Sequence, residues 1–218
     1  MKHEKAVWLS ENMDKAVRRD RVFLNNPVVM QGMGLAPLVV AATTGQNALM
    51  LSVAVLIMLT PTRVVAALIS RTSVYRFRAL TYCLCSSLSY IAAYFALRAM
   101  FGPQMLQLGI FLPVLVVEPL IIKRYERPRN EKVTVALKKG LRITAGYILV
   151  LMLIGMLREI LALGSVFGTP IPHMGHLLLP MAALPTGGFI LVGVLCAVWR
   201  GAVNAYKKHI NMEAKRGV

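Results

Sequence analysis

Four ionisable side chains lie inside long apolar stretches of this 218-residue chain: Arg63, Glu118, Arg158 and Glu159. Charge is costly in such surroundings, so these residues are candidates for an ion path or for buried ion pairs. Glu118 could bind a cation, carry a proton or pair with Arg63, and both side chains could instead extend to the nearby basic boundary. For the adjacent Arg158 and Glu159 we expect a structural ion pair, with direct ion handling as the alternative.

The cysteines and histidines offer little metal chemistry. Cys83 and Cys85 lie about 200° apart on a helix, and with Cys196 the chain has only three thiols, so we expect small buried hydrophobes. His173 and His176 are three residues apart, but their loop contains Gly and Pro and no acidic partner, so we expect no metal there. Because nucleotide-binding glycine loops and nucleophile elbows are missing too, we predict no catalytic residue and no independent enzyme activity.

The composition is typical of a membrane protein. Hydrophobic residues make up 57% of the chain and charged residues 16%, whereas soluble domains average about 25% charged. The net charge of +16 could indicate nucleic-acid binding. However, the basic residues form short clusters between apolar runs, so we exclude nucleic acid and predict an all-α polytopic membrane protein in contact with the lipid bilayer.

Six apolar runs are long enough to cross a bilayer, which takes about 20 residues. The predicted spans are Pro27 to Thr44, Ala48 to Ser70, Ala79 to Ala99, Met105 to Ile122, Ile143 to Leu163 and Leu177 to Trp199. With these spans, 22 of the 25 Lys and Arg residues fall on one side of the membrane, so both termini are predicted to be cytoplasmic. The domains would be a cytoplasmic segment (1–26), a six-span membrane domain (27–200) and a basic cytoplasmic tail (201–218).

The segment before the first span is amphipathic. Ala6, Leu9, Met13 and Val17 recur at helical spacing beside charged residues. A helix lying on the membrane and a solvated helical lead-in are both consistent with this pattern.

The two halves of the chain show a weak internal similarity. Residues 35–40 (LAPLVV) resemble residues 112–117 (LPVLVV), and the three spans between them would invert the second half relative to the first. The first span contains Gly34 and Pro37, and the fourth contains Pro113. Because proline removes a backbone donor and glycine weakens a helix, we predict that both spans are broken, with simple proline kinks as the alternative. Broken helices often hold ions or cofactors at membrane depth.

Several motifs resemble the Rnf/Nqr family of membrane subunits, in particular its Rnf E and Nqr D branches. They are Asn26-Pro27, GLAPL at 34–38, IFLPVLVV at 110–117 and GMLREIL at 155–161. The resemblance covers nearly the whole chain. It implies a subunit of a complex that couples electron transfer to ion translocation in the plasma (inner) membrane of a prokaryote. It also implies an opposite-topology homologue as partner, with flavins expected only on other subunits.

The chain departs from the family at the positions that would bind iron. The resemblance implies a [2Fe-2S] cluster shared with the homologue, with one cysteine in a Gly-x-Cys-Pro motif and one after a Thr-Asn pair. Here these two positions are Ala36 and Pro119, neither of which offers a thiolate. We therefore expect no cofactor on this chain alone and a role as scaffold or ion path. The alternatives are a cluster-free transporter of small solutes or ions on the same fold, and a purely structural assembly subunit.

Overall fold

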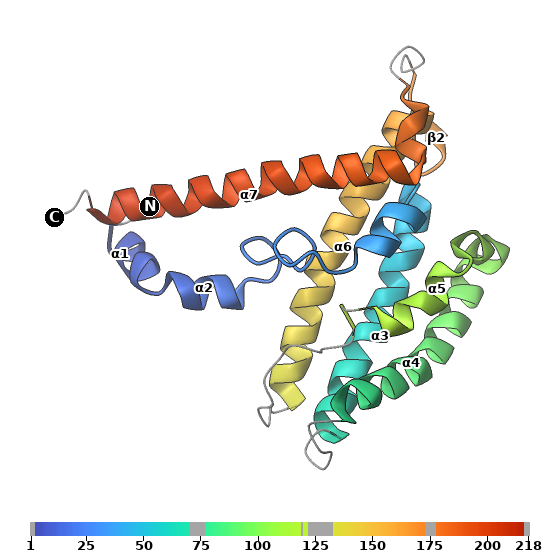
Figure 1. The fold of residues 1–218 in the computed structure, drawn as a ribbon, viewed down its shortest axis with the longest axis horizontal. Coiled ribbons are helices and arrows are strands. Elements are labelled where there is room, and N and C mark those ends of the chain that lie inside the picture. Colours follow the sequence, from blue (N-terminus) through green and yellow to red (C-terminus); the bar gives the residue numbers. More distant parts are fainter. Residues whose placement is uncertain (1–2, 70–76, 119, 122–132, 173–177, 216–218) are drawn as a thin grey trace.

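The computed structural model describes residues 3–69, 77–118, 120–121, 133–172 and 178–215. The protein is mostly helical (Figure 1), as predicted. Within the described residues, four helical stretches are long and apolar enough to cross a membrane: Gly45–Ile69, Leu80–Leu108, Val133–Leu163 and Pro185–Lys215. They correspond to the second, third, fifth and sixth predicted spans.

The described elements are four long helices, several short helices and one hairpin. The long helices are α3 (Gly45–Ile69), α4 (Arg78–Phe101), α6 (Val133–Leu163) and α7 (Pro185–Lys215). The short helices are α1 (His3–Glu11), α2 (Met13–Arg19), η1 (Pro37–Ala41), η3 (Gly102–Leu108), α5 (Phe111–Val114), η4 (Leu115–Val117) and η5 (Pro180–Ala183). A two-stranded hairpin, β1 (Ser165–Val166) and β2 (Thr169–Pro170), follows α6, so the described chain is not entirely helical.

The first and fourth predicted spans contain only short helical pieces. In the first, the five-residue η1 begins at Pro37, where the missing N–H costs no hydrogen bond, and the backbone before it turns at Gly34 with φ +74°. In the fourth, Gly109 has φ +49° and Glu118 is extended, so α5 and η4 are isolated between two turns. Pro113 lies inside α5, so the predicted break is not at Pro113 but on either side of α5.

Two helices extend beyond their predicted spans. α6 begins at Val133 rather than Ile143. Its first turns contain lysines, which lie outside the apolar run but are good helix formers, so the helix starts before the apolar run does. α7 begins at Pro185 rather than Leu177. Pro180 begins the short helix η5, Leu184 is extended as expected before a proline, and Pro185 begins α7. It then continues to Lys215, so the backbone has no break at the predicted boundary between residues 200 and 201.

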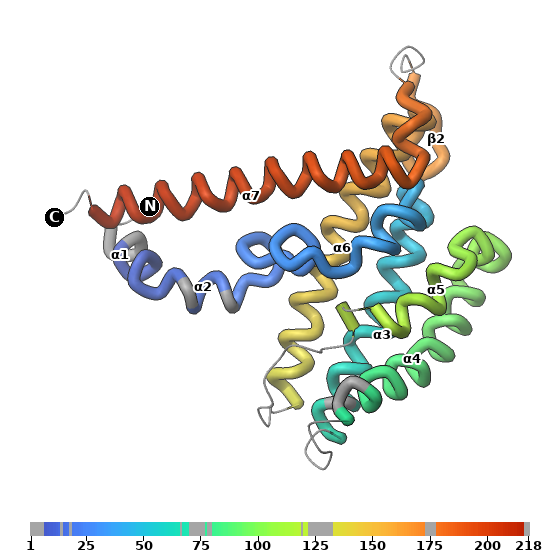
Figure 2. The backbone as a smooth tube through the Cα atoms, in the orientation of Figure 1, coloured from blue at the N-terminus to red at the C-terminus, as the bar shows by residue number. Residues whose placement is uncertain are grey.

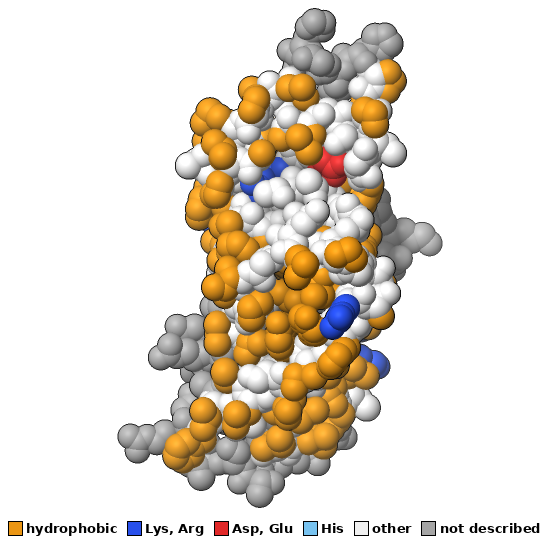
Figure 3. All heavy atoms as spheres, turned by 90° about the vertical axis from the view of Figure 1, so that its right-hand side faces the viewer, with side chains coloured by type: hydrophobic (Ala, Val, Ile, Leu, Met, Phe, Trp, Pro, Cys, Tyr) orange, Lys and Arg blue, Asp and Glu red, His pale blue; other side chains and the backbone are white. Residues whose placement is uncertain are grey.

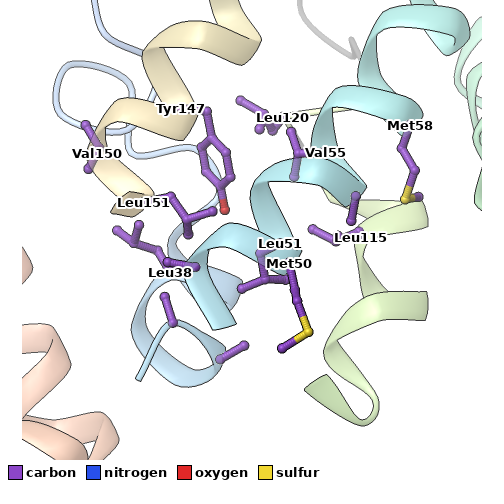
Figure 4. Packing of buried hydrophobic residues seen from close by; sticks show 14 of the residues in the cluster. Leu38, Met50, Leu51, Val55, Met58, Leu115, Leu120, Tyr147, Val150 and Leu151 are labelled. Carbon is purple, nitrogen blue, oxygen red and sulfur yellow. The ribbon is translucent and has the colours of Figure 1, made fainter. Parts of the chain in front are cut away.

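The core lies where α3 packs against α6 and α4. Tyr147 projects from α6 toward α3, among side chains that include Leu38, Leu51, Val55 and Leu120 (Figure 4). By contrast, Leu80, Leu84, Leu88, Ile91 and Phe95 form an exposed stripe on α4. On the side of the molecule seen in Figure 3, hydrophobic side chains cover much of the described surface, as expected for a protein surrounded by lipid.

The N-terminal segment connects α6 with α7. α1 lies against the C-terminal part of α7, and the following residues run between α7 and α6 (Figures 1 and 2). Phe23 stacks on Trp199, whose indole N–H donates to the Phe23 carbonyl, and Arg200 donates to the Val29 carbonyl. The Asn26 amide donates to the Gly146 carbonyl of α6 at 2.8 Å. Residues 20–30 therefore fasten the two helices together.

Candidate functional site

The two interrupted regions meet at Gly34 and Glu118. The backbone N–H of Gly34, just before η1, donates a hydrogen bond to the carboxylate of Glu118, which follows η4. The Gly34 carbonyl accepts a hydrogen bond from the Tyr147 hydroxyl of α6 at 3.1 Å, and the carboxylate lies close enough to Tyr147 for an electrostatic interaction. We call Gly34, Glu118 and Tyr147 the junction; it joins three segments that are far apart in sequence.

The backbone at Gly34 is suited only to glycine. Its φ of +74° disfavours any residue with a Cβ, and such a Cβ would lie 2.3 Å from Cε2 of Tyr147. The Tyr147 ring is completely buried and occupies this space. The turn before η1 therefore fits tightly over the tyrosine of α6.

The junction lies beside Ala36 and Pro119, the two positions where the family resemblance predicts cysteine ligands. Ala36, two residues after Gly34, is exposed on the surface of the chain, whereas Pro119, next to Glu118, lies outside the described residues. Cys83 and Cys85 are on α4 and Cys196 is on α7. No thiolate belongs to the described junction, so its residues do not fit an iron–sulfur cluster. Among the described residues, no group of three or more His, Cys, Asp or Glu could hold a metal ion, and His173 and His176 are not described.

Arg158 is completely buried and holds a second site, at the gap between η1 and α3. Its Nη1 donates to the carbonyls of Val39 and Ala42, where the chain leaves η1. Its other donors bind the chain before α7: Nε donates to Ala182, and Nη2 donates to Ala183 and Leu184. One guanidinium thus binds five backbone carbonyls around this gap, and the carbonyl of Leu184 also accepts a helical N–H, from Gly188.

Glu159 performs the complementary task for the start of α3. One carboxylate oxygen accepts the Gly45 N–H at 2.7 Å, at the positive end of the α3 dipole. The other accepts the Ser165 hydroxyl and the Gly168 N–H, and the Phe167 N–H also donates to this side chain. The predicted ion pair between Arg158 and Glu159 is therefore wrong. Both residues are structural, but they bind different backbone segments, because neighbouring residues on a helix point about 100° apart.

Arg63 packs against a different part of α6. It is buried on α3, and its Cδ lies 3.4 Å from the position that a Cβ on Gly140 would occupy. Tyr147, which lies near Glu118, is two turns beyond Gly140 on α6. The pairing of Arg63 with Glu118 stays a prediction, as does the use of either residue in an ion path.

Two residues of these sites were not predicted as functional. Tyr147 carries no signal in the sequence, since a single tyrosine in an apolar helix is ordinary core. Asn26 belongs to a recognised motif but without an assigned role; its amide donates to Val22 and Gly146, and its oxygen accepts from Val28 and Val29. The side chain is fully buried and anchors the broken segment to α6.

Comparison with known proteins identifies the family of this chain. A family profile described as Rnf-Nqr subunit, membrane protein, matches residues 15–196. The chain belongs to the Rnf-Nqr family of membrane subunits. It is 28% identical over 186 residues, 85% of each chain, to a Clostridium ljungdahlii protein named as the E subunit of a proton-translocating ferredoxin:NAD(+) oxidoreductase complex.

Two further relatives are named as the E subunit of an ion-translocating oxidoreductase complex. The protein from Shewanella loihica is 33% identical over 189 residues, which cover 80% of this chain and 81% of the relative. The protein from Haemophilus influenzae is 28% identical over 216 residues, which cover 91% and 92%. Similarity to these Rnf-Nqr proteins therefore extends over most of the chain.

Proposed function

We propose that this Rnf-Nqr protein is a membrane subunit of a complex that couples redox chemistry to ion translocation and that it binds no [2Fe-2S] cluster of its own. The names of its relatives describe E subunits of ion-translocating oxidoreductase complexes. Within the complex the chain would serve as scaffold or ion path. Flavins and other electron carriers would belong to partner subunits.

The junction is the observation that carries the cluster-free part of this proposal. The hydrogen bond between Gly34 and Glu118 joins the two altered motifs, which supports the view that the two interrupted regions still come together as a cluster site would require. The atoms that meet are a backbone amide, a carboxylate and a phenol rather than thiolates. Thiolates are the ligands that iron–sulfur clusters require.

The membrane arrangement that we propose has six crossings in two inverted halves, with both termini in the cytoplasm of a prokaryote and the chain in its plasma membrane. Support comes from the short, interrupted elements, which fall in the first and fourth predicted spans. An opposite-topology homologue would pack against the exposed Ala36, just before η1. Such a partner would cover the place where a shared cofactor would otherwise lie.

The experiment is to purify the complex in its native state through a tag on this chain and to identify the co-purifying proteins. Low-temperature EPR of the reduced complex, together with iron and acid-labile sulfide analysis, then tests for the cluster. We expect flavin-bearing or ferredoxin-like partners and no [2Fe-2S] signal from the membrane part.

Two outcomes would contradict the proposal in different ways. A [2Fe-2S] signal that persists when the soluble partners are stripped off would show that other ligands replaced the missing cysteines. Purification of the chain without any redox partner would instead favour the transporter or the assembly subunit. A tag accessible only from outside the cell would overturn the proposed orientation.

A further inference from the structure

We propose that the Glu118 carboxylate is a proton-binding site and that Tyr147 is its positioning residue. The inference rests on the proposed function, because it names the ion that an ion path through the junction would carry. Glu118 takes up one proton on a carboxylate oxygen and releases it again. Tyr147 stays protonated, and its hydroxyl donates a hydrogen bond to the Gly34 carbonyl.

Comparison of the two buried carboxylates supports this assignment. Both are at least nine-tenths buried, with Glu118 7% exposed and Glu159 1% exposed. Glu159 accepts hydrogen bonds from four groups, those of Gly45, Ser165, Phe167 and Gly168. Within the described residues the carboxylate of Glu118 accepts one, from Gly34. An ionised carboxylate has about four acceptor sites, and leaving most of them empty in an apolar setting favours the neutral acid.

The chemistry around Glu118 favours a proton over a metal cation. Sodium or calcium would need several oxygen ligands around it. The Gly34 carbonyl already accepts from Tyr147, the Glu118 carbonyl accepts from the Ile121 N–H, and Gly34 presents an N–H to the carboxylate. An N–H repels a cation, whereas a proton needs only the carboxylate itself.

The other ionisable residues near the junction do not alter the assignment of Glu118 as a proton-binding site. Tyr147 faces the carboxylate from α6. Arg142, on α6 itself, donates toward the Arg19 carbonyl, and the Arg21 carbonyl lies where a Cβ on Gly146 would be. These contacts draw the N-terminal segment to α6 through its backbone.

Arg63 is the remaining basic group to consider, and it lies against Gly140. Gly140 and Tyr147 are seven residues apart, about 10 Å along the helix. If Arg63 reached Glu118 instead, the carboxylate would stay ionised, so the same experiment distinguishes the two arrangements.

Tyr147 acts through Gly34 rather than on the proton. Its ring fills the space that Gly34 leaves, and its hydroxyl holds the carbonyl of Gly34, which restrains the backbone of the residue whose N–H meets the carboxylate. Tyr147→Phe keeps the ring and removes the hydroxyl. It should leave the fold intact and move the pH at which Glu118 titrates to a higher value, because the charged form then has less polar surroundings.

The test is infrared difference spectroscopy of the purified protein in lipid nanodiscs while the pH is stepped from acid to alkaline. We expect a carbonyl-stretch band of a protonated carboxylic acid that shifts in D₂O, disappears at higher pH and is absent in Glu118→Gln. Glu159→Gln is the matched control, since the band should persist when the multiply bonded carboxylate is changed. Tyr147→Phe should keep the band and shift its titration.

Several outcomes would contradict the proposal. No carboxylic acid band at any pH, or a band lost in Glu159→Gln and kept in Glu118→Gln, would overturn the proposal. A titration in Tyr147→Phe that coincides with wild type would remove Tyr147 from it. If Glu118→Gln does not assemble, ¹³C-labelled glutamate decides whether the wild-type band comes from a glutamate at all. The measurement needs no partner protein, so it can fail or succeed independently of the proposed complex.

Discussion

The gap between η1 and α3 and the junction are both built from broken backbone and buried charge, yet they satisfy that charge very differently. At the gap, Arg158 donates to five carbonyls, and Glu159 accepts from four donors. At the junction, Glu118 accepts one N–H among the described residues. A charge surrounded by backbone partners is part of the scaffold, whereas a charge with few partners can change its protonation state.

The largest effect is expected from removing the guanidinium at the gap. Arg158→Ala would remove the side-chain donor from five carbonyls, three of them in buried hydrogen bonds, which should lower the free energy of unfolding by more than about 3 kcal/mol. Arg158→Lys keeps the charge but offers at most three donors without the planar fork, so it should recover only part of the loss. The stability of both variants can be measured by thermal unfolding in detergent, with the monodisperse fraction after heating as the readout. Wild-type stability in Arg158→Ala would show that the gap does not depend on this residue.

A smaller loss should follow from filling the space at the junction. Gly34→Ala places a methyl group against the Tyr147 ring and strains the positive φ, so we expect a loss of about 1–3 kcal/mol. Gly32→Ala is the matched control, because Gly32 also has a positive φ of +66° but nothing lies within 4 Å of its would-be Cβ. The difference between the two variants isolates the contact with Tyr147. Equal losses would mean that the junction is held by backbone conformation alone.

The sequence was sufficient to predict the long helices, because runs of about 20 apolar residues have few alternatives in a membrane. It also predicted an interruption of the first span from Gly34 and Pro37 and of the fourth from Pro113, although the breaks of the fourth fall at Gly109 and Glu118. The ends of α6 and α7 could not be predicted from hydropathy, since a helix does not stop where lysines begin. The start of α7 is set by Pro185 rather than by the beginning of the apolar run.

The sites were only partly predictable. Arg158 and Glu159 were identified as unusual, but adjacency in sequence suggested a pair, and only the fold shows that each reaches a different backbone segment. The contact between Gly34 and Glu118 joins residues 84 positions apart, and no local pattern encodes it. Tyr147 could be found only by asking what fills the space beside a glycine.

The smallest expected effect concerns the coupling between Glu118 and Arg63. Each single change to Ala should affect stability through its own surroundings, since Arg63 packs at Gly140 and Glu118 meets Gly34 and Tyr147, two turns away along α6. If Glu118 is the proton-binding site proposed above and does not pair with Arg63, the double variant should equal the sum of the two single variants within about 0.5 kcal/mol. Unfolding titrations of all four proteins in the same detergent mixture give this coupling energy. A coupling above about 1 kcal/mol would place an ion pair between them, and an ion pair would make Glu118 a satisfied charge like Glu159 rather than a proton carrier.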